Sequence, residues 1–203
     1  MREVLKLALI LTLICGVSAG TLEVVRDNLA AKIEMQNDLH VRGPALSALL
    51  QKPADQMLKN KIIFSLDDHQ YPIFFSVTND KISQLAIEDI GKGGYGGNIV
   101  LMLGIDLNSE KLLGVEIISH SETPGVGSQI EKSSFKKQWN NLSAVNPINL
   151  KSAGGQVDGI SGATYSSSAM INGSNSILAL FKDNKAEIME KISQQQARSG
   201  ELK

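Results

Sequence analysis

The chain is poor in the two residue types that build most disulfide frameworks and zinc sites. Its single cysteine, Cys15, lies in an apolar run near the N-terminus, and its histidines, His40, His69 and His120, are scattered. A disulfide needs two cysteines, and metal sites of Cys and His need ligands at short, regular spacings. The sequence therefore excludes a disulfide framework and argues against a metal site built from these residues.

Neither sign of charge is in excess. The chain has 20 Lys and Arg against 21 Asp and Glu, a formal net charge of −1. A nucleic-acid-binding surface needs a basic excess, so composition offers no support for that class. No Gly-Lys-Ser/Thr sequence is present either, which excludes a P-loop. With 203 residues and 42% hydrophobic content, the chain is long enough for one folded domain and an anchor.

The one long uncharged run covers residues 7–22 and follows Arg2 and Lys6. Crossing a membrane takes about 20 mostly apolar residues, with a lower limit of roughly 17. With the Lys6 amine reaching back to the headgroups, residues 4–22 are long enough to lie in lipid. We therefore predict a membrane anchor over residues 1–25.

A cleaved signal peptide is the alternative interpretation of the same run. The small residues Val17-Ser18-Ala19 would form its cleavage site before Gly20. A lipoprotein is disfavoured, because the Thr-Leu-Ile before Cys15 is a poor lipobox. Both remaining interpretations keep the basic end in the cytoplasm and export the rest of the chain.

The remainder of the chain predicts strands followed by helices. Residues 26–60 are expected to form a helical juxtamembrane segment, with helices over 24–39 and 53–59. Turn residues then separate strand-like runs, which predicts hairpins and an antiparallel sheet. The runs cover residues 62–66, 71–77, 82–87, 99–105 and 112–119.

Helices are predicted over residues 128–139, with Ile130, Phe135 and Trp139 facing inward, and over 166–181. A charged helical tail is expected over residues 184–203. Strands followed by helices, without regular alternation, favour an α+β fold over a doubly wound sheet.

The first segment that could bind a ligand is the glycine-rich stretch of residues 91–97. Gly91, Gly93 and Gly96 match the spacing of the dinucleotide-binding fingerprint. That fingerprint requires a helix directly after it, because the helix end holds the pyrophosphate. Residues 98–103 are strand-like instead, so we reject the match and predict a turn between strands.

The second segment, residues 120–127, reads His-Ser-Glu-Thr-Pro-Gly-Val-Gly and follows a predicted strand. Such a loop can bring backbone amides close to a planar ligand. A plain connection in which Ser128 caps the next helix is an equal alternative. His120 by itself is interpreted as a surface histidine.

The third segment, residues 158–168, reads Asp-Gly-Ile-Ser-Gly-Ala-Thr-Tyr-Ser-Ser-Ser and leads into a predicted helix. The small residues before Thr164 would let an enzyme reach its hydroxyl. A phosphate on that oxygen would lie against the unpaired amides and the positive end of the helix. A simple N-cap at Thr164 or Ser166, worth about 1 kcal/mol, is the alternative.

Together the three segments resemble a known family. Residues 158–164 are similar to the Asp-x-x-Ser/Thr-Gly-Ala-Thr signal of ApbE-type flavin transferases. Residues 120–127 resemble the family's His-x-Glu-Thr-Pro-Gly-Leu-Gly loop, with Val126 for Leu, and residues 94–97 resemble its Gly-Tyr loop. In order and spacing the chain is similar to the G subunit of the Rnf ion-translocating electron transport complex. It is more distantly similar to the C subunit of the sodium-pumping NADH:quinone reductase.

The resemblance implies FMN joined by a phosphoester to Thr164, which would be a tether and not a catalyst. An FMN-binding domain would then cover residues 61–183. The residues that the resemblance places beside the cofactor are Tyr95, Glu122, Thr123, Pro124, Gly125, Val126, Gly127, Ser161, Gly162 and Ala163. Asp158 would belong to the transferase's recognition signal, unless it only forms an Asx turn.

The resemblance also implies a role and a place. The protein would transfer electrons within a ferredoxin:NAD oxidoreductase complex of the bacterial inner membrane, with its FMN domain on the periplasmic side. Its partners would be the other subunits and the flavin transferase. The alternatives are the sodium-pump component named above, a stand-alone exported FMN carrier, and a structural anchored domain that never receives flavin.

Overall fold

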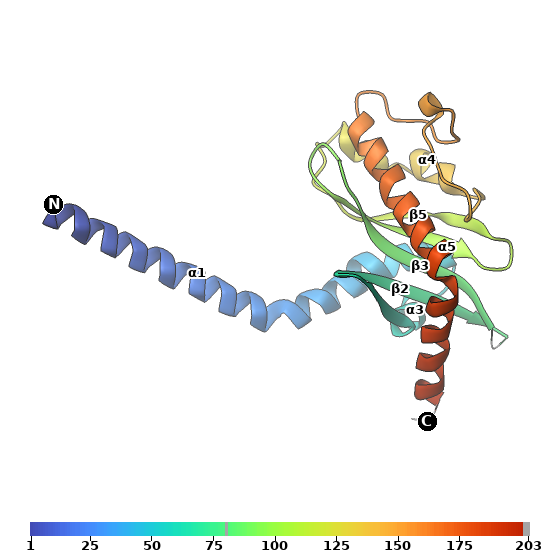
Figure 1. Ribbon diagram of the computed structural model, residues 1–203, viewed down its shortest axis with the longest axis horizontal. Coiled ribbons are helices and arrows are strands. Elements are labelled where there is room, and N and C mark those ends of the chain that lie inside the picture. Colours follow the sequence, from blue (N-terminus) through green and yellow to red (C-terminus); the bar gives the residue numbers. More distant parts are fainter. Residues whose placement is uncertain (80, 201–203) are drawn as a thin grey trace. The chain divides into compact units, whose positions relative to one another are not determined.

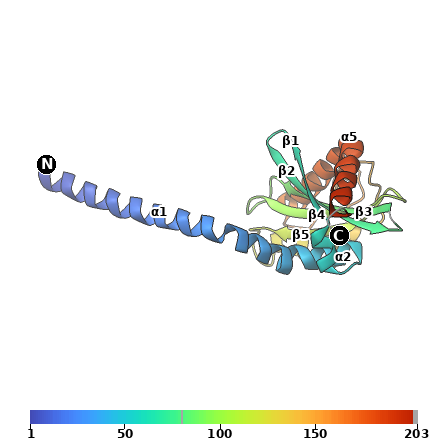
Figure 2. The same cartoon turned by 90° about the horizontal axis from the view of Figure 1, so that it is seen from below.

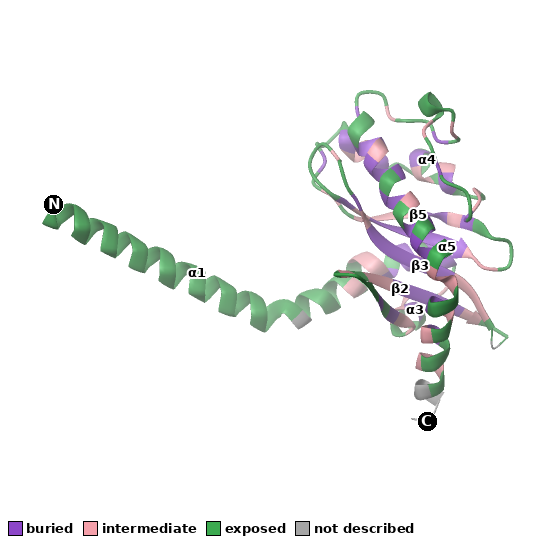
Figure 3. Cartoon of the chain, in the orientation of Figure 1, coloured by how far each residue is buried: buried purple, intermediate pink, exposed green. Residues whose placement is uncertain are grey.

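The computed structural model describes residues 1–79 and 81–200, so the last three residues of the expected tail lie outside it. Two compact units are found, residues 1–40 and the chain from Val41 onward. The first consists of helix α1 (Arg2–Asn37), whose described side chains are exposed (Figures 1 and 3). Its segment Arg2–Ala30 contains an 18-residue stretch with a mean hydropathy of 2.0 and is long and apolar enough to cross a membrane.

The second unit is built on an antiparallel sheet of five strands in the order β1-β2-β3-β4-β5 (Figure 1). Each strand pairs with the next along the chain, as the hairpin prediction requires. The expected strands and the α+β class are therefore confirmed. The strands are β1 (Lys61–Leu66), β2 (His69–Thr78), β3 (Lys81–Gly91), β4 (Ile99–Asp106) and β5 (Lys111–Ser119).

The first two tight turns between the strands use residues that tolerate a left-handed backbone. Asp67 joins β1 to β2 with φ of 51°, and Asn79 begins the β2–β3 turn with φ of 52°. Asp and Asn accept this conformation more readily than other side chains do. The short hairpins thus follow from the residues at the turns.

Helices cover both faces of the sheet, as Figure 2 shows with α5 (Thr164–Gly200) and α2 (Gly43–Leu50) on opposite sides. Successive strand residues point to opposite faces, so Phe74 packs in the cluster beneath α2 and Phe75 in the cluster beneath α5. The short helix α3 (Ala54–Lys59) adds Met57 to the first cluster. Because both faces are buried, the central strands are nearly continuous apolar runs.

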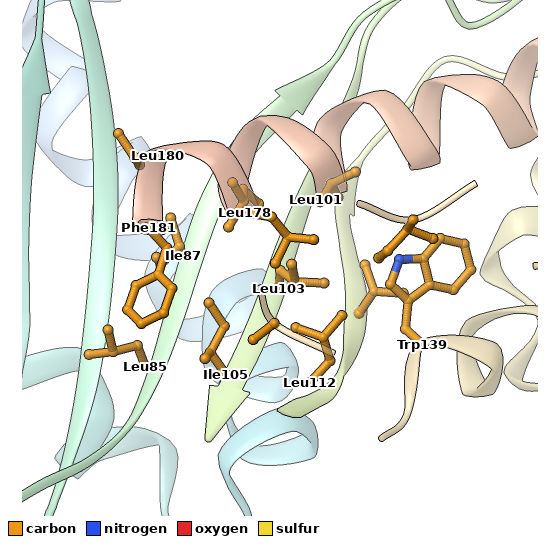
Figure 4. Packing of buried hydrophobic residues seen from close by; sticks show 14 of the residues in the cluster. Leu85, Ile87, Leu101, Leu103, Ile105, Leu112, Trp139, Leu178, Leu180 and Phe181 are labelled. Atoms are coloured by element: carbon orange, nitrogen blue, oxygen red, sulfur yellow. The ribbon is translucent and has the colours of Figure 1, made fainter. Parts of the chain in front are cut away.

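The larger core lies between α5 and the sheet. Figure 4 shows Leu178 and Phe181 of α5 in the same cluster as Leu103 and Ile87 of the sheet. Trp139 closes one end of this core, where its indole Nε1–H donates to the Ser174 hydroxyl at 2.9 Å. α5 is therefore held by the sheet on one side and by the segment around Trp139 at its edge.

The prediction of one helix over residues 128–139 is wrong. The structure has η2 (Gly127–Glu131), then an extended Lys132 with ψ of 134°, and then α4 (Ser133–Lys136), which continues directly into η3 (Lys137–Trp139). On one continuous α-helix, Ile130 and Phe135 would point about 140° apart. The break at Lys132 lets both side chains reach the core, where they and Trp139 are buried as expected.

The region after Trp139 is a long irregular connection with one short 3-10 turn, η4 (Lys151–Ala153). It leads to α5, which begins at Thr164 and continues to Gly200 through a single non-helical residue, Asn184. The helix expected after Thr164 and the helical part of the tail described by the structure are thus two helical segments that meet at a kink at Asn184.

Candidate functional site

The glycine-rich stretch forms the loop between β3 and β4, and a strand follows it as expected. The rejection of the dinucleotide fingerprint is confirmed. Two of its glycines allow close packing: a Cβ on Gly91 would collide with the Ala169 carbonyl of α5, and one on Gly96 with the Ser121 carbonyl. The loop can therefore lie against both the start of α5 and the loop after β5.

Glu122 ties the three candidate segments together. Its side chain is buried, with only 5% of the residue exposed. One carboxylate oxygen accepts the Gly96 N–H at 3.1 Å, and the other accepts the Ser166 hydroxyl at 2.6 Å. The glycine loop, the 120–127 loop and the first turn of α5 thus meet at one carboxylate.

His120 is not the surface histidine that we expected, because its side chain is only 12% exposed. Its Nδ1 accepts the backbone N–H of Glu122 at 3.0 Å. A nitrogen that accepts carries no proton, so the other ring nitrogen, 3.1 Å from a Glu131 oxygen, is the donor to that carboxylate. Through this hydrogen bond His120 orients the backbone of Glu122.

The rest of the 120–127 loop closes on itself. The Ser128 hydroxyl accepts the Gly125 N–H at 2.9 Å, and the Gln129 side chain donates to the Gly125 carbonyl at 2.9 Å. Ser128 therefore braces the loop and does not cap a following helix. Gly125 has φ of 78°, a conformation that favours glycine.

The first turn of α5 presents three Thr and Ser hydroxyls in different surroundings. Ser166 and Ser167 are buried, and their hydroxyls donate to Glu122 and to the Ala163 carbonyl. Thr164 is exposed, and its hydroxyl has no partner in the described part of the chain. It is the first helical residue, with Gly162 before it at φ of 78°, so it is not the N-cap that the alternative required.

A hollow of about 410 Å³ lies beside Thr164, within the usual size range of ligand pockets. It brings together most of the residues that the sequence singled out, but not Pro124, Gly125 or Ser161. Its lining is Tyr95, Glu122, Thr123, Val126, Gly127, Gly162, Ala163, Thr164, Tyr165 and Ser166.

Two residues that line the hollow were not predicted to do so. Tyr165 was not considered, and Ser166 was considered as a possible N-cap. Tyr95 and Tyr165 are 77% and 69% exposed, so two aromatic rings stand at the mouth of the hollow. The position of Tyr165 directly after Thr164 was the available signal.

A larger hollow of about 670 Å³ lies by the β2–β3 turn, lined by residues that include Lys52, Lys81 and Asp106. None of the three candidate segments contributes to it. We place the candidate site in the smaller hollow, because there the buried carboxylate, the helix N-terminus and a free hydroxyl meet.

Comparison with known proteins identifies a domain family over this part of the chain. Residues 94–179 match the model of the FMN-binding domain family, a range that contains Tyr95, Glu122 and Thr164. A Haemophilus influenzae protein described as the G subunit of an ion-translocating oxidoreductase complex is 30% identical over 195 residues, which cover 91% of each chain. The protein of the same description from Shewanella piezotolerans is 27% identical, covering 93% of this chain and 94% of its own.

Among solved structures, the fold is similar to that of the C subunit of the Na(+)-translocating NADH-quinone reductase from Parabacteroides distasonis. The TM-score is 0.57 at 20% sequence identity, over 75% of this chain and 94% of that one. This likeness concerns the fold alone. From the match over nearly the full length of its relatives, the chain belongs to the family of G subunits of ion-translocating oxidoreductase complexes and contains an FMN-binding domain.

Proposed function

We propose that this protein is an electron-transfer subunit of a membrane-bound ion-translocating ferredoxin:NAD oxidoreductase complex. It carries FMN joined through its phosphate to Oγ1 of Thr164. The observation that carries the proposal is the contrast among the hydroxyls at the start of α5. Thr164 Oγ1 is exposed and unengaged, whereas the hydroxyls of Ser166 and Ser167 are buried and hydrogen-bonded.

The surroundings of Thr164 fit a phosphate and an attached ring. The first amides of α5 lack intrahelical acceptors and, with the helix dipole, favour an anion at this end. The adjacent hollow has aromatic rings, those of Tyr95 and Tyr165, at its mouth and the Val126 side chain in its wall. Flat aromatic side chains provide surfaces on which a planar ring can stack.

The attachment is a phosphoryl transfer and needs an activated donor. We propose a flavin nucleotide in which the FMN phosphate is joined by an anhydride bond to a second nucleotide. A bond forms between Thr164 Oγ1 and that phosphorus, the anhydride bond breaks, and the second nucleotide leaves as its monophosphate. The hydroxyl proton goes to a base of the transferase, and no group is oxidised or reduced.

The structure presents Asp158 in a way that suits recognition by such an enzyme. The Gln138 side chain accepts the Asp158 N–H at 2.7 Å and donates to the Asp158 carbonyl at 3.2 Å. The carboxylate, 63% exposed, pairs with Lys151 at 2.6 Å instead of forming an Asx turn. Its backbone is held while its charge faces solvent.

Covalent attachment explains how an exposed site retains its cofactor. A tether keeps the local concentration of the ring high even where each contact is weak. When bound, the flavin supplies the redox chemistry. The protein's own part is to hold the phosphate at α5, to enclose one side of the ring and to leave its mouth open toward redox partners.

The apolar helix α1 supports membrane anchoring, with residues 4–22 in lipid. Arg2 and Lys6 would keep the N-terminus in the cytoplasm and place the FMN-binding domain on the periplasmic side. We further propose residues 1–25 as anchor, 26–60 as juxtamembrane segment, 61–183 as FMN-binding domain and 184–203 as tail.

The test uses the full chain co-expressed with an ApbE-type flavin transferase. Thr164→Val removes the hydroxyl at nearly constant volume, so flavin fluorescence on a denaturing gel and the added mass of FMN should both vanish. Thr164→Ser keeps a hydroxyl at this position and should retain the label, as should Ser166→Ala. A bare Thr164 in the wild-type protein, beside an active transferase, would refute the proposal.

The two other functions are separated by a second measurement. Affinity purification of the detergent-solubilised wild-type protein should recover other redox subunits of the complex. A stand-alone carrier would be recovered by itself. A component of a sodium-translocating NADH:quinone reductase, the enzyme whose C subunit has a similar fold, would bring that enzyme's subunits instead.

A further inference from the structure

The second compact unit contains three carboxylates that are buried within its described residues, and Glu122 differs from the other two. Glu88 accepts two hydrogen bonds from Arg42, at 2.6 and 2.8 Å, and Asp89 lies 3.0 Å from a His69 ring nitrogen. Each of these carboxylates thus has a basic partner. For Glu122 the described residues provide no cation.

The partners of Glu122 are dipoles. They are the Gly96 N–H, the Ser166 hydroxyl and the N-terminal end of α5, on whose first turn Ser166 lies. Dipoles stabilise a buried charge without cancelling it. The charge therefore remains as a local field at the bottom of the hollow.

The backbone around this carboxylate holds it in place. A Cβ on Gly94 would lie 2.5 Å from one carboxylate oxygen, and a Cβ on Gly127 would collide with the other. Both glycines leave just the space that the carboxylate occupies. The two hydrogen bonds from Gly96 and Ser166 hold the carboxylate in this space.

We propose that the ionised Glu122 carboxylate lowers the midpoint potential of the flavin bound in this hollow. The inference rests on the proposed function, since it requires FMN on Thr164. Reduction adds negative charge to the ring, and a fixed negative charge nearby opposes that addition more strongly in a buried site than in water. The Ser166 hydroxyl moderates the effect, because its positive end points at the carboxylate.

If the role of Glu122 were purely structural, a different effect on the midpoint potential would be expected. A carboxylate that acts only as a hydrogen-bond acceptor can be replaced by an amide, since glutamine offers one acceptor for Gly96 and one donor toward the Ser166 oxygen. Glu122→Gln would then leave the potential unchanged. Under our proposal the same variant removes the charge and keeps the shape.

The experiment is a spectroelectrochemical titration of the flavinylated full-length protein and its variants in detergent. We expect Glu122→Gln to shift the midpoint potential to more positive values. Ser166→Ala removes the moderating dipole and should shift it to more negative values. Glu110→Gln is the matched control, because Glu110 is exposed, pairs with Lys185 and does not line the hollow. The midpoint potential of this variant should equal that of the wild type.

An unchanged or more negative potential in Glu122→Gln would overturn the proposal, and so would shifts of equal sign in both variants. If Glu122→Gln does not accept flavin, Ser166→Ala decides: a more negative potential supports the proposal, and any other result overturns it. Intact mass reports flavin loading separately. A wild-type protein without flavin would count against the proposed function, whereas a loaded protein with unresponsive potentials would count only against the role of Glu122.

Discussion

The hydroxyl of Ser166 donates a 2.6 Å hydrogen bond to the carboxylate of Glu122, a residue 44 positions earlier in the chain. Both side chains are buried, and the bond joins the first turn of α5 to the loop that follows β5. Through Glu122 the glycine loop at Gly96 is joined as well. The geometry of the candidate site therefore depends on contacts between segments that are distant in sequence.

Gly127→Ala tests how tightly these segments are packed. The added Cβ would collide with the Glu122 carboxylate and lie 2.9 Å from the Ser166 oxygen. We expect the free energy of unfolding to fall by about 1–3 kcal/mol, the usual cost of overpacking, as measured by urea denaturation. Gly93→Ala is the control, since it meets open space and only strains a backbone with φ of 93°. A smaller loss for Gly127→Ala than for this control would contradict the packing described.

Ser174→Ala tests the bond that anchors Trp139 to α5. The substitution leaves the buried indole N–H of Trp139 without its acceptor. An unsatisfied buried donor costs about 1–3 kcal/mol, which denaturant unfolding would measure. Trp139 is the one tryptophan of the chain, so its fluorescence follows the transition. A variant as stable as the wild type would show that the bond contributes nothing.

Tyr71 provides a prediction about pH. Burial raises its pKa above 10.0, and the negative charges of Asp89 and Asp67 raise it further. A pKa raised by folding means that the unfolded chain loses its proton first. The associated stability is present below about pH 10 and is lost as the pH rises through the folded-state pKa.

The measurement is the tyrosinate absorbance of a Tyr95→Phe/Tyr165→Phe variant, in which Tyr71 is the remaining tyrosine. We expect Tyr71 to titrate at higher pH in the folded than in the denatured protein. Asp89→Asn should bring the two titrations closer together. Coincident curves in the parent variant would disprove the shift.

Truncation tests where the folded domain begins. Residues from Val41 onward form one compact unit, so we expect removal of residues 1–40 to leave the melting temperature unchanged. Removal of residues 1–60 also deletes α2 and α3 and uncovers Phe74 and Met102 on the sheet. That fragment should melt at lower temperature or aggregate. Equal stability of the two fragments would show that α2 is dispensable.

The strands were predictable because each lies between turn residues, and pairing with the next strand needs only a short hairpin. The structure of residues 128–139 was not predictable in the same way. Ile130, Phe135 and Trp139 are five and four residues apart, a spacing close enough to that of one helical face to suggest a single helix. In the folded chain the helix breaks at Lys132, because only then can the side chains of both Ile130 and Phe135 reach the core. The local sequence pattern does not specify where the core of the folded domain lies.

His120 and Tyr165 show the same limit at the site. His120 was interpreted as a surface residue, but the Glu131 carboxylate and the Glu122 backbone enclose it. Tyr165 was overlooked, although it lines the hollow beside Thr164. Whether a polar or aromatic residue is covered depends on neighbours that come from other parts of the chain.

The sequence by itself determined the order of strands, the apolar N-terminal helix and the three motifs, because each is written in contiguous residues with a local physical meaning. Only the tertiary structure decided that the motifs converge on one buried carboxylate and that the Thr164 hydroxyl stays exposed while those of Ser166 and Ser167 are buried and hydrogen-bonded. Burial and hydrogen bonding between distant segments are properties of the packed chain, and no local pattern encodes them.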